Sequence, residues 1–347
     1  MSAAKMKADE ATRAPDLSRL LDIVSAFVRQ RIVVLGDFVV DEYVTGEISR
    51  VSREAPVLIL RHKQTQIIPG GGANAANNLA DLGAEVFPIG VVGDDGAGNA
   101  LIEYFRCKKV DVSGIIRARG WTTATKTRFL ARWTHTSRQQ VLRVDRGSET
   151  ELPARVAERI IRKSRDRVAK SDAVIVSDYG AGSVTPRLLK GVRAKIATLD
   201  SRYRLLDYRG MKITAATPNE PELEALYHSK IGNDRRTLEI LGQRTLRSLK
   251  LSALLVTRGK DGMVLFERAK APYEIRVYGS DDAVDVTGAG DTVIAAFTLA
   301  LAAGASFVDA AHLANYAGGI VVMKRGTATV TRAELENAIR GEATVGA

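Results

Sequence analysis

The 347 residues are 45% hydrophobic and 26% charged, the balance of a globular protein, and the single Cys107 excludes a disulfide framework or a cysteine-based zinc site. No apolar run approaches the ~18–20 residues of a membrane span, and the polar N-terminus lacks the apolar core of a signal peptide, so we expect a cytoplasmic protein with no membrane partner. The net charge of +11 is spread along the chain, and its densest stretch, residues 155–170, is typical of the exposed face of an amphipathic helix, which argues against a nucleic-acid partner.

Strand-like and helical patterns alternate along most of the chain. In chain order, we expect a helix at 17–30, a strand at 32–35, a helix at 72–82, a strand at 86–92, a helix at 153–169, a strand at 173–177, a helix at 188–195, strands at 196–200 and 213–216, helices at 221–227 and 235–249, strands at 253–257 and 263–267, and helices at 290–303, 307–323 and 332–340. This alternation predicts an α/β fold whose central, mostly parallel sheet is flanked by helices.

Two segments, about 43–66 and 123–145, break this alternation, because they carry strand-like apolar periodicity with no helix between the strands. Such strands predict a small antiparallel sheet that stands beside the main body as a lid. Since no linker rich in Gly, Ser or Pro interrupts the chain, residues 17–341 are expected to form one domain. Residues 1–16 are expected to be a disordered leader, and residues 342–347 a tail.

Residues 285–291, Asp-Val-Thr-Gly-Ala-Gly-Asp, precede an apolar helical run. The glycines allow a tight turn in which the N–H groups of Gly288, Ala289 and Gly290 face one point at a helix N-terminus, an anion site favoured by the helix dipole. Asp291 stands beside it as a candidate base, and an anion site next to a base is what phosphoryl transfer to a hydroxyl requires. The alternative for this motif alone is an ordinary glycine turn with a capping Asp.

A second glycine cluster, residues 69–78, leads into a helix of small residues that carries Asn74. Gly71 and Gly72 allow a ligand to approach the backbone closely, and an amide can bond vicinal sugar hydroxyls as donor and acceptor. Asp37 follows the first expected strand, at the sheet edge where α/β proteins bind ligands, so we expect it to bind sugar hydroxyls too. Close helix packing and capping are the alternatives for these residues.

Together these motifs resemble the two signatures of the ribokinase/PfkB family of carbohydrate kinases. Residues 70–74 match the first signature and residues 285–291 the second, in family order and more than 200 residues apart. The resemblance covers about residues 32–341. It implies a ribokinase-like fold with a β-sheet lid, and an ATP-dependent kinase in which Asp291 is the base for a sugar hydroxyl.

The resemblance also implies nucleotide and metal sites. Asn219 and Glu222 match the family's Asn-x-x-Glu element and are expected to hold Mg²⁺, through water, beside the nucleotide phosphates. Further nucleotide-binding residues are expected at Thr257, Arg258, Gly259, Gly262 and Asn315. A homodimer formed through the lid is implied as well, and a requirement for a monovalent cation such as K⁺ stays open.

Within the family, several segments resemble the kinases of D-glycero-β-D-manno-heptose 7-phosphate, which act in ADP-heptose synthesis for lipopolysaccharide: 34–37, 49–57, 139–145, 176–179 and 251–258. The implied acceptor is O1 of that heptose phosphate, with Asp178 among its contacts. Lys126, Arg138 and Arg143 are candidates for binding its phosphate, and solvated lid charges are the alternative for all three. Because the chain ends before the nucleotidyltransferase domain that some relatives carry, kinase chemistry alone is expected.

Two departures from the subgroup pattern leave the sugar open. Gly180-Ala181-Gly182 replaces a stretch that carries a lysine, and Ser201-Arg202 replaces Pro-Lys; Lys and Arg bind phosphate differently. Fructose, ribose, a hexose phosphate or a nucleoside are therefore alternatives, and residues 133–136 resemble an insertion in the lid. No Walker P-loop occurs, and Gly36 stands alone where a dinucleotide enzyme has Gly-x-Gly-x-x-Gly. A non-catalytic sugar-binding protein on the same fold is the alternative from another class.

Overall fold

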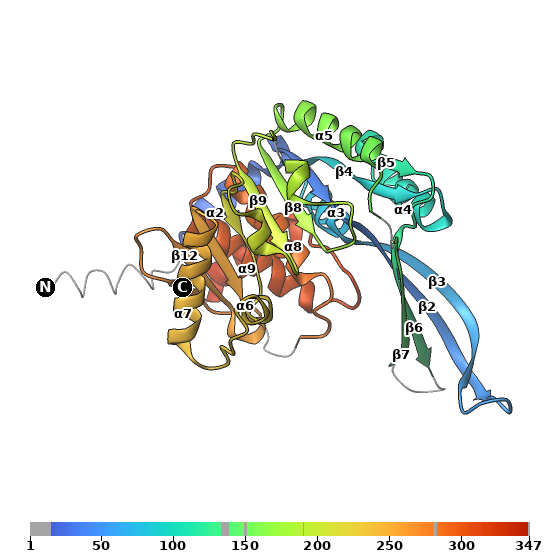
Figure 1. Ribbon diagram of the computed structural model, residues 1–347. Coiled ribbons are helices and arrows are strands. Elements are labelled where there is room, and N and C mark those ends of the chain that lie inside the picture. Colours follow the sequence, from blue (N-terminus) through green and yellow to red (C-terminus); the bar gives the residue numbers. More distant parts are fainter. Residues whose placement is uncertain (1–14, 133–138, 149–150, 190, 280–282, 346–347) are drawn as a thin grey trace, which may run out of the picture.

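The computed structural model describes residues 15–132, 139–148, 151–189, 191–279 and 283–345 (Figure 1). Its central sheet has the strand order β13-β12-β11-β10-β9-β8-β1-β4-β5. The strands are β1 Arg31–Gly36, β4 Glu85–Gly93, β5 Ile115–Ala118, β8 Ala173–Asp178, β9 Ala197–Ser201, β10 Ala215–Ala216, β11 Ala253–Thr257, β12 Met263–Glu267 and β13 Tyr273–Ile275. Pairing is parallel from β5 to β11 and antiparallel at β12 and β13, which confirms the expected mostly parallel sheet.

Helices cover both faces of this sheet. They are α2 Leu17–Ser25, α3 Gly72–Asp81, α4 Gly96–Cys107, α5 Ala154–Val168, α6 Glu220–Tyr227, α7 Arg235–Ser248, α8 Ala289–Ala302, α9 Phe307–Val322 and α10 Arg332–Val345. Neighbouring residues of β1 point to opposite faces: Val34 packs in the core cluster under α3, α8 and α9, and Val33 in the cluster under α5 and α7. A strand buried on both faces requires the unbroken apolar run seen in the sequence.

The lid is a second sheet with the order β3-β2-β6-β7, and it extends away from the body (Figure 1). Its strands are β2 Phe38–Val51, β3 Leu58–Gly71, β6 Ala124–Arg132 and β7 Gln139–Arg146. The two outer pairings are antiparallel and the central β2–β6 pairing is parallel. β2 begins two residues after β1 ends, and β3 runs directly into α3. Both strands therefore join the body near the glycine cluster at residues 69–78.

Some expected elements differ from the structure. The helix expected at 188–195 is wrong: a 3₁₀ turn at Pro186–Leu189 is present, and Gly191, with φ of +84°, takes a left-handed conformation that does not continue a helix. The helix α4 and the edge strands β5 and β13 were not expected. The C-terminal helix runs to Val345, so most of the expected tail is helical.

The expected leader falls mainly on residues 1–14, which lie outside the described residues, as do residues 133–136. Asp16, at its end, caps α2 by accepting a hydrogen bond from the N–H of Arg19. Within the part of the chain that the structure describes, no helix has the length and apolar character needed to cross a membrane.

Candidate active site

Asp291 lies in the first turn of α8 and is 2% exposed. Its Oδ2 accepts a hydrogen bond of 2.9 Å from Asn74 Nδ2, and its Oδ1 accepts one of 2.8 Å from the hydroxyl of Tyr179. Burial raises the pKa of Asp291 to about 7, although both donors oppose the shift. A carboxyl group that titrates near neutral pH suits general-base chemistry.

The turn before Asp291 has the geometry expected of an anion site, with one exception. Gly288 caps α8 in the left-handed region at φ of +80°, and a Cβ there would lie 2.6 Å from Asn74 Nδ2, so only glycine fits. Among the described residues, the N–H groups of Gly288 and Gly290 have no acceptor within the chain. The N–H of Ala289 donates to the carbonyl of Val286, and its expected role in the anion site stays a prediction.

Asn74 contacts the candidate base directly. Its side chain is fully buried, and besides Asp291 it contacts Asn78, whose Nδ2 donates to Asn74 Oδ1 at 3.2 Å. Asn78 in turn accepts from the hydroxyl of Thr292. The amide thus links α3 to the start of α8, and its expected sugar contact stays a prediction.

The glycines of the cluster at residues 69–78 let the chain approach itself closely. Gly72 and Gly36 face each other so closely that a Cβ on either would lie 2.8 Å from the other's Cα. Gly71, at φ of +55°, lies between the carbonyl of Asp37 and the ring of Tyr179. Both Gly71 and Gly72 are buried, and their expected role as substrate contacts stays a prediction.

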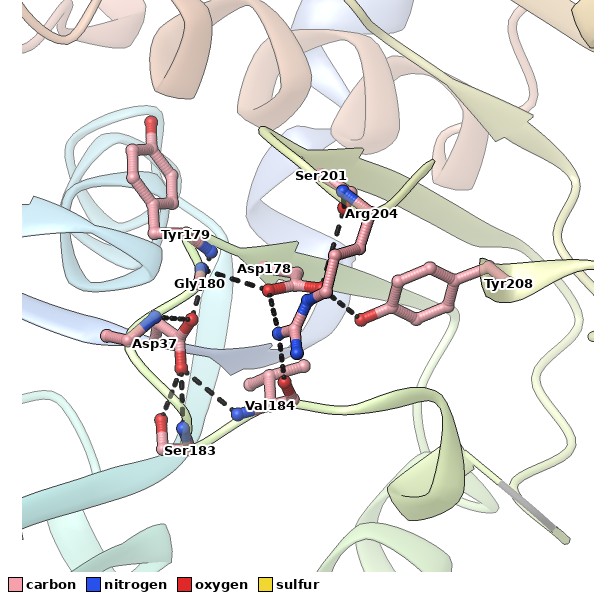
Figure 2. Close-up of polar contacts among 10 residues, drawn as sticks. Asp37, Asp178, Tyr179, Gly180, Ser183, Val184, Ser201, Arg204 and Tyr208 are labelled. Atoms are coloured by element: carbon pink, nitrogen blue, oxygen red, sulfur yellow. Dashed lines mark hydrogen bonds and ion pairs between the residues drawn. The ribbon is translucent and has the colours of Figure 1, made fainter. Parts of the chain in front are cut away.

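Asp37 holds the loop that follows β8. It is fully buried, and its carboxylate accepts five hydrogen bonds of 2.6–3.0 Å: from the N–H groups of Tyr179, Ala181, Ser183 and Val184 and from the hydroxyl of Ser183 (Figure 2). These donors occupy lone pairs that a sugar hydroxyl would also use. The expected binding of sugar hydroxyls by Asp37 stays a prediction.

Asp178 is likewise 1% exposed and bonded within the chain. It accepts hydrogen bonds from Arg204 Nη2 at 2.7 Å, from the hydroxyl of Tyr208 at 2.8 Å and from the N–H of Gly180 at 3.0 Å (Figure 2). Its expected contact with the substrate stays a prediction. Asp37 and Asp178 together fix residues 179–184, the loop that carries Tyr179 to Asp291.

Cations of the lid face this loop. Lys126 Nζ lies 5.5 Å from the centre of the Tyr179 ring, and Arg128 and Arg143 occupy paired positions on β6 and β7. Burial lowers the pKa of Lys126. The positive charges of Arg202, Arg143 and Arg128 lower it further, whereas the negative charge of Asp41 raises it. Arg143 donates two hydrogen bonds to Asp145, from Nε and from Nη2. Arg138 lies outside the described residues.

A network that the sequence did not predict joins the lid to the C-terminal segment. Arg128 Nη1 lies 2.5 Å from Asp41 Oδ1, Thr327 donates to Asp41 Oδ2, and the hydroxyls of Tyr43 and Thr327 are 3.0 Å apart. A cavity of about 500 Å³ lies beside it. Its lining includes Tyr43, Gln66 and Arg128 from the lid and Asp285, Thr287 and Gly326 from the body.

Asn219 and Glu222 form a reciprocal cap on α6: Asn219 Oδ1 accepts from the N–H of Glu222, and Glu222 Oε2 from the N–H of Asn219. Burial raises the pKa of Glu222. It also raises that of Asp200, at the end of β9, where Glu222, Asp291 and Asp178 add to the shift. The described residues include no set of three side chains placed to ligate a metal directly. Carboxyl groups that repel each other fit a cation held through water.

The expected nucleotide loop lies beside this cap. Thr257 bridges to Asn219, and Arg258 pairs with Glu220 at 2.7 Å. Gly262, at φ of +77°, lies close to the backbone of Ile275: a Cβ on Gly262 would lie 2.1 Å from the carbonyl oxygen of Ile275. Gly259 has open space around it.

Asn315 lies on α9, apart from this loop. Its Nδ2 donates to the carbonyl of Arg276, and the residue lines a cavity of about 370 Å³ with Tyr273, Tyr278 and His312. The cavity is thus bordered by α9, by β13 and by the segment that follows β13.

Comparison with known proteins identifies relatives. A sequence model of the pfkB family of carbohydrate kinases matches residues 29–334. The chain is 39% identical over 319 residues to the bifunctional protein HldE of Desulfatibacillum aliphaticivorans, covering 90% of this chain and 64% of that protein. It is 41% identical over 310 residues to the protein of the same name from Geobacter metallireducens, covering 87% and 61%. The chain spans somewhat less than two thirds of these relatives.

Solved structures share the fold. A ribokinase of Arabidopsis thaliana, complexed with ribose and ATP, matches with a TM-score of 0.69 at 19% identity, covering 90% of this chain and 99% of that one. Phosphofructokinase-2 of Escherichia coli, in complex with potassium, matches with a TM-score of 0.73 at 17% identity and the same coverage. The expected ribokinase-like fold is confirmed. The chain belongs to the pfkB family of carbohydrate kinases.

Proposed function

We propose that residues 17–341 form one kinase domain that transfers the γ-phosphate of ATP to O1 of D-glycero-β-D-manno-heptose 7-phosphate. The observation that carries this proposal is the position of Lys126. Its ammonium group lies over the ring of Tyr179, whose hydroxyl contacts the candidate base Asp291. A half-buried cation two contacts from the base fits an acceptor that brings a phosphate of its own. The relatives named bifunctional protein HldE support the same subgroup.

In this mechanism Asp291 accepts the proton of the attacking hydroxyl late, as the oxygen gains charge, so its position matters more than its basicity. The N–H groups of Gly288 and Gly290 face the charge that develops on the transferred phosphoryl group. Lys126 and Arg143 hold the sugar phosphate.

Asn219, Glu222 and Asp200 would hold Mg²⁺ through water, and the ion would supply neutralisation of the nucleotide phosphates. The cavity at Asn315 would take the adenine. Asn315 precedes Val322 by about 10 Å of helix, and the carbonyl of Val322 accepts from residues 284 and 285, which lead to Gly288. That separation fits the length between an adenine and its terminal phosphates. Activity measured with and without K⁺ tests the open cation requirement.

We further propose a homodimer formed through the lid. Its sheet exposes a group of large apolar side chains: Val51, Val57, Leu58, Val141, Leu142 and Val144. Exposed apolar groups of this kind favour a protein partner, and a second copy of the lid is complementary in chemistry. Leu142→Asp combined with Val144→Asp should convert a dimer into a monomer in light scattering; an unchanged mass excludes this surface.

An ADP-release assay with a panel of acceptors tests the substrate. Heptose 7-phosphate should exceed the unphosphorylated heptose, fructose and ribose by ~10²-fold or more in kcat/KM, because a charged hydrogen bond to each phosphate contact is lost without it. Lys126→Met should abolish most of this preference. Lys63→Met, at an exposed lysine of β3, is the matched control. Preference for an unphosphorylated sugar would overturn the proposal and leave the family assignment intact.

A further inference from the structure

Tyr179 contacts the candidate base and belongs to no motif that the proposed mechanism uses. Its hydroxyl donates to Asp291 Oδ1 at 2.8 Å, while Asn74 donates to Oδ2. Each carboxylate oxygen therefore accepts one hydrogen bond: Oδ2 from a residue of α3, and Oδ1 from a residue of the loop after β8. Each oxygen keeps a further lone pair, on which an acceptor hydroxyl can dock.

The backbone at Tyr179 is held by two buried carboxylates, those of Asp37 and Asp178. Its N–H donates to Asp37, and the next N–H, of Gly180, donates to Asp178 (Figure 2). Asp37 also binds residues 181, 183 and 184 of the same loop. Two buried carboxylates thus hold a short loop whose first residue is the tyrosine. This is the pre-organised support that a positioning group requires.

The ring of Tyr179 is fixed from both sides. Gly71 leaves room for it, since a Cβ at that position would lie 3.3 Å from Tyr179 Cδ2. Lys126 of the lid lies over the ring, 5.5 Å from its centre. Burial raises the pKa of Tyr179 well above its ordinary value, and Asp291, Asp200 and Glu222 add to the shift. The phenol therefore stays protonated and acts only as a donor to Asp291.

We propose that Tyr179 is a positioning residue for the base: its hydroxyl aims the Asp291 carboxylate and holds it in the charged form that accepts the proton. The proposal rests on the proposed role of Asp291. Charged groups face Asp291 from several elements: Lys126 of β6 favours the anion, whereas Asp41 of β2 and Asp200 of β9 oppose it. Against those two acids and burial, the hydroxyl of Tyr179 is one of two neutral donors that favour ionisation.

The test is the pH dependence of kcat/KM for Tyr179→Phe. A hydrogen bond to a charged group corresponds to about one pKa unit or more, so the ratio of variant to wild type should be ~10-fold lower at pH 6 than at pH 9. Taking the ratio cancels the ionisation of the sugar phosphate and of ATP. Tyr104→Phe is the matched control. Tyr104 lies in α4, and its ring has a lysine ammonium, that of Lys108, at the same distance of 5.5 Å. The control ratio should be constant with pH.

A ratio for Tyr179→Phe that is flat with pH, or that falls as pH rises, overturns the proposal. Replacement of Tyr179 by 3-fluorotyrosine covers the case in which the phenylalanine variant folds poorly. Its more acidic phenol is a stronger donor, so the apparent pKa in kcat/KM should move below that of wild type; no shift, or an upward shift, overturns the proposal.

Asp291→Asn, measured in parallel, separates the two proposals. If that variant keeps its turnover, the proposed base is wrong. If it is inactive while Tyr179→Phe keeps the wild-type profile, the base stands and the role of Tyr179 is wrong.

Discussion

Thr327 donates a hydrogen bond of 3.1 Å to Asp41, across a sequence separation of 286 residues. The same Thr327 hydroxyl lies 3.0 Å from the hydroxyl of Tyr43, and Asp41 also pairs with Arg128. Thr327 therefore joins strand β2 of the lid to the body directly, and strand β6 through Asp41, beside residues that line the cavity of about 500 Å³.

Thr327→Val should loosen this junction without altering shape. Two hydrogen bonds are lost, each worth ~0.5–1.5 kcal/mol, so KM for the sugar should rise by ~5–160-fold while kcat stays within ~3-fold. Steady-state kinetics measure both. Thr329→Val is the control, because Thr329 bonds Asp81, away from the cavity. Equal effects of the two variants would contradict a role for Thr327 in holding the lid.

Asp291→Asn should stabilise the protein in a pH-dependent way. The folded-state pKa of about 7 lies above the ordinary value of 3.8, so the wild type loses stability as pH rises from about 4 to about 7. Asparagine has no charge to bury, and its oxygen can accept from Asn74 while its NH₂ group donates to the hydroxyl of Tyr179, which rotates to accept. At pH 8 the gain should approach a few kcal/mol, at ~1.36 kcal/mol per pKa unit, and it should shrink at pH 5. Thermal unfolding at both pH values decides; a gain independent of pH would contradict the raised pKa.

Gly72→Ala should lower stability more than substrate affinity. The added Cβ would lie 2.8 Å from Gly36 Cα, and overpacking of this kind costs ~1–3 kcal/mol. The midpoint of thermal unfolding should fall by several degrees. Gly96→Ala, at the start of α4 with no atom within 4 Å of the new Cβ, should be neutral. A variant at Gly72 with unchanged stability and a raised sugar KM would support its expected role as a substrate contact.

The fold was predictable because its signals are local. Unbroken apolar runs such as residues 32–35 mark strands buried on both faces, and the alternation of such runs with helices implies the parallel sheet. The exception at 188–195 has a local cause as well, since Gly191 takes a left-handed conformation that apolar spacing does not reveal.

The partners of the site residues were not predictable in the same way. Small residues at Gly72 and a carboxylate at Asp37 indicate close approach and hydrogen bonding, but not to what. The structure assigns those contacts to Gly36 and to a loop more than 140 residues away. Tyr179 was noted only within residues 176–179 for their resemblance to the subgroup, and Thr327 belonged to no motif, because the roles of both residues arise only when distant segments meet. The assignment of Asp291 as base stays a prediction.

The turnover of Asp291→Asn, measured by ADP release at saturating sugar phosphate and ATP, tests that assignment most directly. The variant keeps the shape of the side chain and removes the capacity to accept a proton; its oxygen can still accept from Asn74, while its NH₂ group must donate to the hydroxyl of Tyr179, which then accepts. A lost general base lowers kcat by ~10²–10⁴-fold, and KM for both substrates should change little. A kcat within ~3-fold of wild type would show that Asp291 does not deprotonate the acceptor hydroxyl.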